Sequence, residues 1–487
     1  DATRRCEAVD VLTAEREALL RRVVGRVATW LGGALGVNRL SSLRASGTCG
    51  AFGGVSVPSA YGGGGKAGVD LGILVTAWPD HPDTLGWAIA CRYLGTNRRP
   101  VMGQINITPR GLARVLDDPD FYESADAYVF KVMLHEMFHV LGVNAAAYQY
   151  WVHDGASAPR GVDNVVARGT TNGKQVWRVV TPTVRAETRA HFDCATLAGA
   201  ELEDLDTSGG SNGAASHLEK RVFVNELMNA IVWPTRTVAS RVSLALLDDS
   251  GWYTVNYALA EPLQWGARAG CRFVDRDCDA SPAWQANEYE LCADRFAAEC
   301  TWDGAAYGQC ALLTYPSPLP AEYQYFDGEP RLGGEARTDY CPMVYPNMAV
   351  CIAASRAPTP WGESFGATSR CFKSTLLDAN VGPALPAPEP KCHPHRCDGT
   401  HVEVRVGDAY YRCRPDGGPM AVPGFNGAFT CPPATDVCCT APCARGYCWR
   451  DRCYCDPGFD GAQCTQCTAS PAALGNNLCS APVPAQP

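Results

Sequence analysis

The sequence lacks several features that would place it in common functional classes. It has no uninterrupted run of about eighteen apolar residues, so no segment is predicted to span a membrane. It has no cluster of Lys or Arg, and its net charge of −9 argues against a nucleic-acid partner. The chain starts at Asp1 with neither an initiator methionine nor a signal-peptide pattern, which predicts a processed or recombinant mature form.

Cysteine, in contrast, is abundant. The 487-residue chain contains 25 cysteines, and thirteen of them lie between Cys392 and Cys479. This density is typical of a disulfide framework in a secreted or surface-displayed protein. The alternative is a cytosolic protein with structural zinc on Cys464 and Cys467, which is less favoured because no second pair lies at a suitable spacing. Since the count is odd, one thiol is free or has its partner outside this chain.

The length and the apolar pattern predict several folded regions. A chain of 487 residues, 46% of them hydrophobic, is too long for one core and predicts about two to four domains. An amphipathic helix is expected from its cap at Thr13 to Leu31, and a second helix from Ser124 to a stop at Gly142. The other expectations are strands at 69–78, 86–94 and 101–107, polar loops over 145–216, a helix at 238–249 and a linker at 383–391.

The stretch KVMLHEMFHVLGVN, residues 131–144, carries the pattern His-Glu-x-x-His. On a helix, His135 and His139 lie one turn apart on the same face, and Glu136 between them can reach a metal-bound water. The pattern also occurs by chance, but its helical context and the strands upstream favour the zinc interpretation. A catalytic zinc usually takes three protein ligands, and Ala145 stands where the longer metzincin motif has its third histidine.

The third ligand must therefore come from elsewhere, and His217 is the predicted residue. It follows a glycine-rich turn and precedes Met228 by eleven residues, and metzincins place a methionine turn beneath their zinc after the third histidine. Its separation of 78 residues from His139 is acceptable because insertion into a surface loop costs little free energy. The other candidates lack such a context, and the two in KCHPHRC are expected on a disulfide-closed surface loop. These candidates are His153, His191, His393, His395 and His401.

The segments HEMFHVLGVN and SHLEKRVFVNELMN, with a long insertion between them, resemble the leishmanolysin family of surface zinc proteases. Similar segments elsewhere include CEAVDVLTAEREALL, GWAIAC, INITPR, WGARAGCRF, YQYF, DYCPMV and FTCPPATDVC, so the resemblance covers roughly residues 1–440. It implies an α+β fold, with a metzincin-type zinc protease catalytic module and a disulfide-rich C-terminal domain made mainly of strands and loops. It also implies that Cys6 is unpaired, because the family partner of this cysteine lies upstream of Asp1.

The last region has a cysteine pattern of its own. The spacing Cys443-x4-Cys448-x4-Cys453-x-Cys455-x8-Cys464, which includes CYCDPGFDGAQC, predicts an EGF-like tail that would bind a protein. Four domains are expected: a catalytic subdomain with the motif helix, a central subdomain with the insertion and the third histidine, a cysteine-rich domain, and this tail. Their expected boundaries are 1–143, 144–264, 265–440 and 441–487.

These residues predict a zinc-dependent endopeptidase with one catalytic Zn²⁺. Glu136 would activate the zinc-bound water as a general base and then protonate the leaving amine. Met228 would lie beneath the site without ligating. The strand at 86–94 is expected to pair with an extended polypeptide substrate at the edge of the cleft, with an interior strand as the alternative. The predicted zinc ligands are His135, His139 and His217.

The resemblance further implies a location on the extracellular face of the cell surface through a GPI anchor, or secretion, and an inhibitory pro-segment before maturation. No membrane contact other than a lipid anchor is expected. A competing hypothesis is an adhesion ectodomain on a protease fold, against which the retained Glu136 argues. A third hypothesis, a disulfide-rich protein with a chance motif, predicts no stoichiometric zinc. Asn106, in the one glycosylation sequon, lies on a predicted core strand and is expected to be unmodified.

Overall fold

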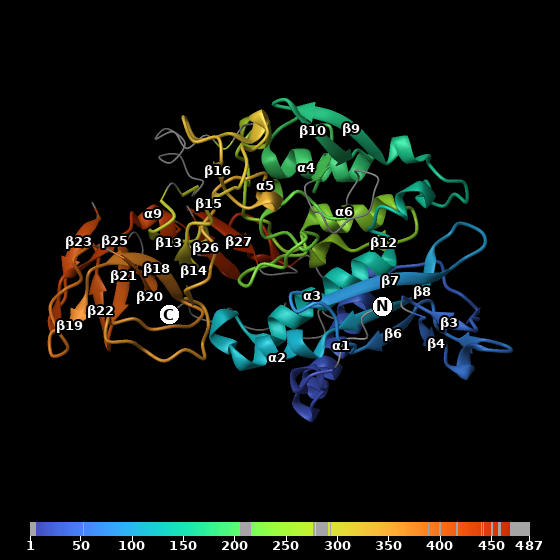
Figure 1. The fold of residues 1–487 in the computed structure, drawn as a ribbon, viewed down its shortest axis with the longest axis horizontal. Coiled ribbons are helices and arrows are strands. Elements are labelled where there is room, and N and C mark those ends of the chain that lie inside the picture. Colours follow the sequence, from blue (N-terminus) through green and yellow to red (C-terminus); the bar gives the residue numbers. More distant parts are fainter. Residues whose placement is uncertain are drawn as a thin grey trace.

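The chain folds into a helix-rich half that contains the N-terminus and a strand-rich half that follows it, shown from blue to green and from orange to red in Figure 1. The glycine-rich turn before His217 and the last twenty residues of the predicted tail lie outside the described residues. The computed structural model describes residues 6–467 except 52, 205–215, 276–277, 279–290, 293, 388, 399–400, 415–416, 440, 442, 450 and 456–458.

A three-stranded sheet forms one layer of the helix-rich half. Its central strand β8 (Pro100–Ile107) is buried along its whole length and pairs in parallel with β6 (Gly72–Thr76). On its other side β8 pairs antiparallel with β7 (Gly86–Tyr93), which has no second strand neighbour among the described residues. The expected strand at 86–94 is thus an edge strand, and the interior alternative is wrong.

Asn106, on the central strand, shows how tightly this sheet is packed. Its side chain is fully buried and donates to the Trp78 carbonyl at 3.0 Å. The same side chain accepts from the Trp78 backbone amide at 2.7 Å and from the Thr76 hydroxyl at 2.9 Å. The unmodified state of Asn106 stays a prediction, and the buried, hydrogen-bonded amide is the observation that favours it.

One predicted helix, α3 (Ala125–Leu141), covers this sheet, and a second, α1 (Ala14–Ala34), packs on the other side of α3. Helix α1 begins after Thr13, whose hydroxyl accepts from the Arg16 amide as an N-cap. Helix α3 packs against α1 on one side and against β7 and β8 on the other. Because α3 lies between two layers, eleven of its seventeen residues are buried. Helix α2 (Pro109–Asp117) connects the sheet to it.

The insertion between His139 and His217 is not the polar loop that its composition predicts. It contains an antiparallel sheet in the order β11-β10-β9 and a helix, α4 (Pro182–Phe192), that packs on α6. The polar composition is misleading because several of the charged residues are buried in ion pairs, Lys174 and Arg178 among them. The strands are β9 (Val166–Thr171), β10 (Lys174–Val179) and β11 (Ala200–Leu202).

Helix α6 (Arg241–Asp249) ends where expected but starts three residues later than the predicted start at Val238. Its start is fixed by Ser240, whose hydroxyl accepts from the Val242 amide as an N-cap. Val238 instead pairs with an earlier segment of the chain, since its backbone amide donates to the Asn225 carbonyl. No described helix is both long enough and apolar enough to cross a bilayer.

The strand-rich half contains a six-stranded sheet, and two predictions that fall on it are wrong. Its strand β20 (Glu389–Asp398) includes the end of the expected linker at 383–391 and pairs on both sides, with β18 and with β21. His393 and His395 therefore lie on a central strand and not on a surface loop, and His393 is fully buried. The strand order is β22 (Ala409–Arg412), β21 (His401–Val406), β20, β18 (Ser369–Ser374), β25 (Ala428–Cys431) and β23 (Gly418–Ala421).

Disulfides are concentrated in this half, as the cysteine distribution predicts. Eleven bridges join described cysteines, and nine of them follow helix α7 (Cys271–Asp275). Cys6 is an exposed free cysteine, as expected. Cys464 is bridged to Cys455, so structural zinc on Cys464 is excluded. The bridge Cys439–Cys448 crosses the expected domain boundary at 440.

Candidate metal centre and active site

Helix α3 presents the His-Glu-x-x-His motif in its last two turns. Its first turn is capped by the Ser124 hydroxyl, which accepts from the Ala127 amide at 3.1 Å. Its end is set by Gly142, which adopts a left-handed conformation with φ of 111° and donates its amide to the His139 carbonyl. Both ends therefore agree with the predicted helix.

The segment that carries His217 forms no helix or strand, and backbone hydrogen bonds hold it between residues 201–203 and the turn at Met228. On one side the Glu203 amide donates to the His217 carbonyl, and the Glu219 amide donates to the Glu201 carbonyl, both at 3.0 Å. On the other side the Leu218 amide donates to the Met228 carbonyl at 2.8 Å. The insertion, through the end of β11 and the residue after it, thus positions the third histidine.

The three predicted ligand histidines converge. The Nε2 atom of His139 lies 3.0 Å from Nε2 of His135 and 3.2 Å from Nε2 of His217. A tetrahedral zinc with Zn–N bonds of about 2.0–2.1 Å separates its ligand nitrogens by roughly 3.3–3.4 Å, so the donor set fits such an ion. The group is one of three with ligand atoms within 4.8 Å of one another in the described part of the chain.

Two of these imidazoles are oriented by backbone carbonyls. Nδ1 of His135 lies 2.7 Å from the Leu227 carbonyl oxygen, and Nδ1 of His139 lies 2.8 Å from the Val143 carbonyl oxygen. A carbonyl only accepts, so Nδ1 carries the proton in both rings and the Nε2 lone pair points into the site. This tautomer is the one that a metal needs.

Burial sets the charge state of the site. It lowers the pKa of His135 well below its usual value, and the neighbouring His139 and His217 act in the same direction. Burial, His139 and Arg337 lower the pKa of His217 to about 3. These imidazole rings are therefore neutral at physiological pH, the form in which histidine binds a metal. Burial also raises the pKa of Glu136 to about 8, a value suited to proton transfer near neutrality.

The other sequence-predicted features lie next to this group. Met228 is fully buried, and its neighbour Leu227 contacts His135 through the carbonyl described above. At Gly86, the first residue of edge strand β7, an added Cβ atom would lie 3.4 Å from a carboxylate oxygen of Glu136. The edge strand and the predicted general base are therefore adjacent. The remaining candidate histidines are not in the cluster; His191 contacts the Trp265 carbonyl.

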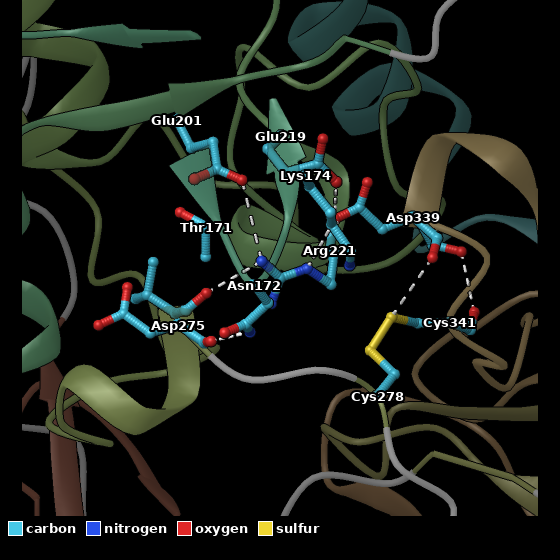
Figure 2. Close-up of polar contacts among 12 residues, drawn as sticks. Thr171, Asn172, Lys174, Glu201, Glu219, Arg221, Asp275, Cys278, Asp339 and Cys341 are labelled. Carbon is cyan, nitrogen blue, oxygen red and sulfur yellow. Dashed lines mark hydrogen bonds and ion pairs between the residues drawn. A yellow bond between two sulfur atoms is a disulfide. The ribbon is translucent and has the colours of Figure 1, made fainter. Parts of the chain in front are cut away.

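A buried cluster of charged side chains, which includes Glu219 and Arg221 shortly after His217 in the chain, was not predicted from the sequence. Arg221, on α5 (Lys220–Phe223), lies 3.1 Å from a carboxylate oxygen of Asp339, and Lys174 lies 3.4 Å from the same oxygen. The Glu219 carboxylate accepts from the Arg221 amide at 2.9 Å. Figure 2 shows these side chains pointing toward one another. No local pattern signals this pairing, because Asp339 lies 118 residues after Arg221.

A buried carboxylate beside three converging neutral imidazoles, on a fold of mixed helices and strands, is the arrangement of a metal-dependent hydrolase. Comparison with known sequences agrees with this class. The chain belongs to the leishmanolysin family of metallopeptidases, whose family model matches residues 1–444.

Individual relatives are similar over most of this chain. A leishmanolysin-like peptidase of Drosophila melanogaster is 28% identical over an alignment of 433 residues that covers 74% of this chain and 62% of the relative. Leishmanolysin of Leishmania donovani is 28% identical over an alignment of 411 residues that covers 80% of this chain and 64% of the relative. A leishmanolysin homolog of Crithidia fasciculata is 28% identical over an alignment of 456 residues, with coverages of 89% and 65%. The chain thus spans slightly less than two thirds of these relatives' length.

Proposed function

We propose that this chain is a zinc-dependent endopeptidase of the cell surface, with His135, His139 and His217 as ligands of one catalytic Zn²⁺. The observation that carries the proposal is the convergence of the three Nε2 atoms, at separations of 3.0 and 3.2 Å, beside the buried carboxylate of Glu136. When bound, zinc lowers the pKa of a coordinated water to about 7 and polarises the substrate carbonyl.

Glu136 has the position and the burial of a general base. It would take a proton from the attacking water and transfer it to the nitrogen of the leaving amine. The same carboxylate would therefore act first as a general base and then as a general acid. Its raised pKa makes the protonated form accessible near neutral pH, although a cation in the site favours the carboxylate. Met228 would form the apolar floor of the site without ligating.

Edge strand β7 supports an extended polypeptide as the substrate. An edge strand offers unpaired backbone groups to a peptide that adds to the sheet, and Gly86 at its start lies next to Glu136. A peptide paired with β7 would therefore pass over the proposed zinc site. This arrangement fits a metzincin-type catalytic module, with an inhibitory pro-segment occupying the cleft before maturation.

The proposed tail is an EGF-like module that binds a protein. Six of its described cysteines, from Cys439 to Cys464, pair first with third, second with fourth and fifth with sixth. The interlaced first two bridges and the hairpin of β26 (Gly446–Trp449) and β27 (Arg452–Cys455) support the assignment. Because the first of these cysteines is Cys439, we place the start of the tail there. The proposed location is the extracellular face of the cell, by a GPI anchor, or the secreted fraction.

Zinc content and casein proteolysis of matched variants test the function. We expect one zinc per chain in the wild type, in Glu136→Gln and in the control His153→Ala, which alters an exposed histidine outside the cluster. Glu136→Gln should lower activity by at least about 10²–10⁴-fold because the general base is lost. His217→Ala should lose most of its zinc and its activity.

Each outcome separates the competing hypotheses. A wild type that binds one zinc but cleaves no protein or peptide substrate would favour the adhesion ectodomain. A wild type without stoichiometric zinc would favour a chance motif. Retention of both zinc and activity in His217→Ala would show that another residue is the third ligand.

A further inference from the structure

We propose that Glu226 is a positioning residue of the metal centre and acts on His135 through a single peptide group. A carboxylate oxygen of Glu226 accepts from the Met228 amide at 2.7 Å. The carbonyl of the same peptide group, that of Leu227, accepts from Nδ1 of His135 at 2.7 Å. A continuous path of two short hydrogen bonds therefore joins the buried carboxylate to a proposed zinc ligand. The inference rests on the proposed zinc site.

The chemistry of this path is that of a carboxylate behind a ligand histidine. In many zinc sites a carboxylate accepts directly from the second ring nitrogen, which fixes the ring and makes it a stronger ligand. Here a peptide group stands between the two. Because a hydrogen bond at the N–H of a peptide polarises its C=O, an acceptor at Met228 strengthens the bond that Leu227 makes to His135.

The second carboxylate oxygen of Glu226 connects the turn that contains Leu227 and Met228 to the segment just before α6. It accepts from the Ser240 amide at 3.1 Å, next to the start of α6. Glu226 is only 1% exposed. Burial raises its pKa, and the hydrogen bonds from the Met228 and Ser240 amides oppose that rise. Each oxygen of the carboxyl group thus accepts from a backbone amide in a site closed to solvent.

The turn also has backbone bonds that do not involve this carboxylate. The Leu227 amide donates to the Val238 carbonyl at 2.8 Å, and the Val238 amide donates to the Asn225 carbonyl at 2.9 Å. Leu218 is attached to the Met228 carbonyl in the same way. A variant that changes only the carboxylate therefore keeps the backbone pairing of the turn. Its effect on the metal can be measured in a folded protein.

The test compares Glu226→Gln with Asp249→Asn as a matched control. Asp249 is also a buried carboxylate that accepts from two backbone amides, those of Thr183 and Val184, at 2.7 and 2.9 Å. Its bonds cap α4 and do not reach a proposed ligand. Both variants lose one charge at constant shape. The dissociation constant for zinc is measured by competition with a chelator, and the ligand field by the visible absorption of the cobalt-substituted protein.

We expect Glu226→Gln to weaken zinc binding by about 10–100-fold and to shift the cobalt absorption, whereas Asp249→Asn changes zinc binding by less than about threefold. A wild type that binds no zinc would refute the proposed site itself. Wild-type zinc binding together with equal dissociation constants in the two variants would overturn the role of Glu226 alone. If Glu226→Gln does not fold, Glu226→Asp is measured instead, and a wild-type dissociation constant in that variant would also overturn it.

Discussion

The proposed metal centre is built from two regions that obtain their shape in different ways. Helix α3 supplies His135 and His139 and is specified by residues within or next to it, from the Ser124 cap to the Gly142 stop. The segment that supplies His217 forms no helix or strand of its own. It is held between the end of β11 and the methionine turn, by chain segments on both sides of it in the sequence.

The second region depends on contacts that extend into the strand-rich half. Four residues after His217, Arg221 pairs with Asp339, and its guanidinium also donates to the Val274 carbonyl at 3.0 Å. Trp265 donates its indole N–H to the Arg221 carbonyl. The position of the third proposed ligand is therefore a property of the whole fold, whereas the position of the first two is a property of one helix.

Removing the buried guanidinium should have the largest effect on stability. In Arg221→Met, Asp339 loses its closer cationic partner while it remains only 3% exposed. Loss of one partner from a buried ion pair costs about 3–5 kcal/mol, and here Lys174 alone would remain to offset the charge of Asp339 in a low-dielectric environment. We expect that decrease in the free energy of unfolding, measured by urea denaturation, and a weaker affinity for zinc.

The matched control is Arg21→Met on α1, which removes an arginine whose side chain is 78% exposed and pairs with Glu17. Exposed pairs contribute little, so a change of no more than about 0.5 kcal/mol is expected. If Arg221→Met were as stable as this control, the His217 segment would not depend on the buried cluster of charged side chains. The contrast between the two regions would then be wrong.

The end of α3 should be the next most sensitive position. Gly142→Ala places a Cβ atom on a residue with φ of 111°, and this atom would lie 2.4 Å from the Trp252 ring. Strain and overpacking together should lower the free energy of unfolding by about 1–3 kcal/mol, measured by thermal denaturation.

The comparison variant for this change is Gly25→Ala, in the exposed interior of α1, where no atom lies within 4 Å of the added Cβ. Alanine is the better helix former, so this variant should be more stable than the wild type by about 0.5–1 kcal/mol. Opposite signs for the two substitutions would confirm that Gly142 is required by its conformation and its close contact. Equal effects would contradict that conclusion.

The same contrast explains how much could be predicted from the sequence. The start of α1 and both ends of α3 follow from caps and apolar spacing, and the motif puts two imidazoles on one face. The end of α1 was not predicted correctly, because the helix continues to Ala34, three residues past the expected Leu31. The choice of His217 required the methionine eleven residues later and the family resemblance, because no local pattern brings a histidine across an insertion. The structure places Nε2 of this imidazole 3.2 Å from Nε2 of His139, and its role as a ligand stays a prediction.

What could not be predicted involves long-range pairing of polar residues. The insertion reads as a loop because Lys174, Arg178 and Glu201 count as polar, yet each of them is buried in an ion pair. The segment around His393 reads as a surface loop because cysteine and proline surround it, yet it lies between two strands. In both cases burial is decided by partners far away in the sequence, about which local hydropathy says nothing.

The smallest of these effects should come from the cap of α3. Ser124→Ala removes the hydroxyl that accepts from the Ala127 amide, which costs about 1 kcal/mol in an N-cap. His135 lies eleven residues after this cap, so the zinc dissociation constant should stay at its wild-type value while the thermal midpoint falls. Ser124→Asp, which retains an acceptor and adds a charge that favours a helix N-terminus, should preserve both. Weaker zinc binding in Ser124→Ala would mean that the ligands on α3 also depend on distant parts of their own helix, and the two regions would then differ only in degree.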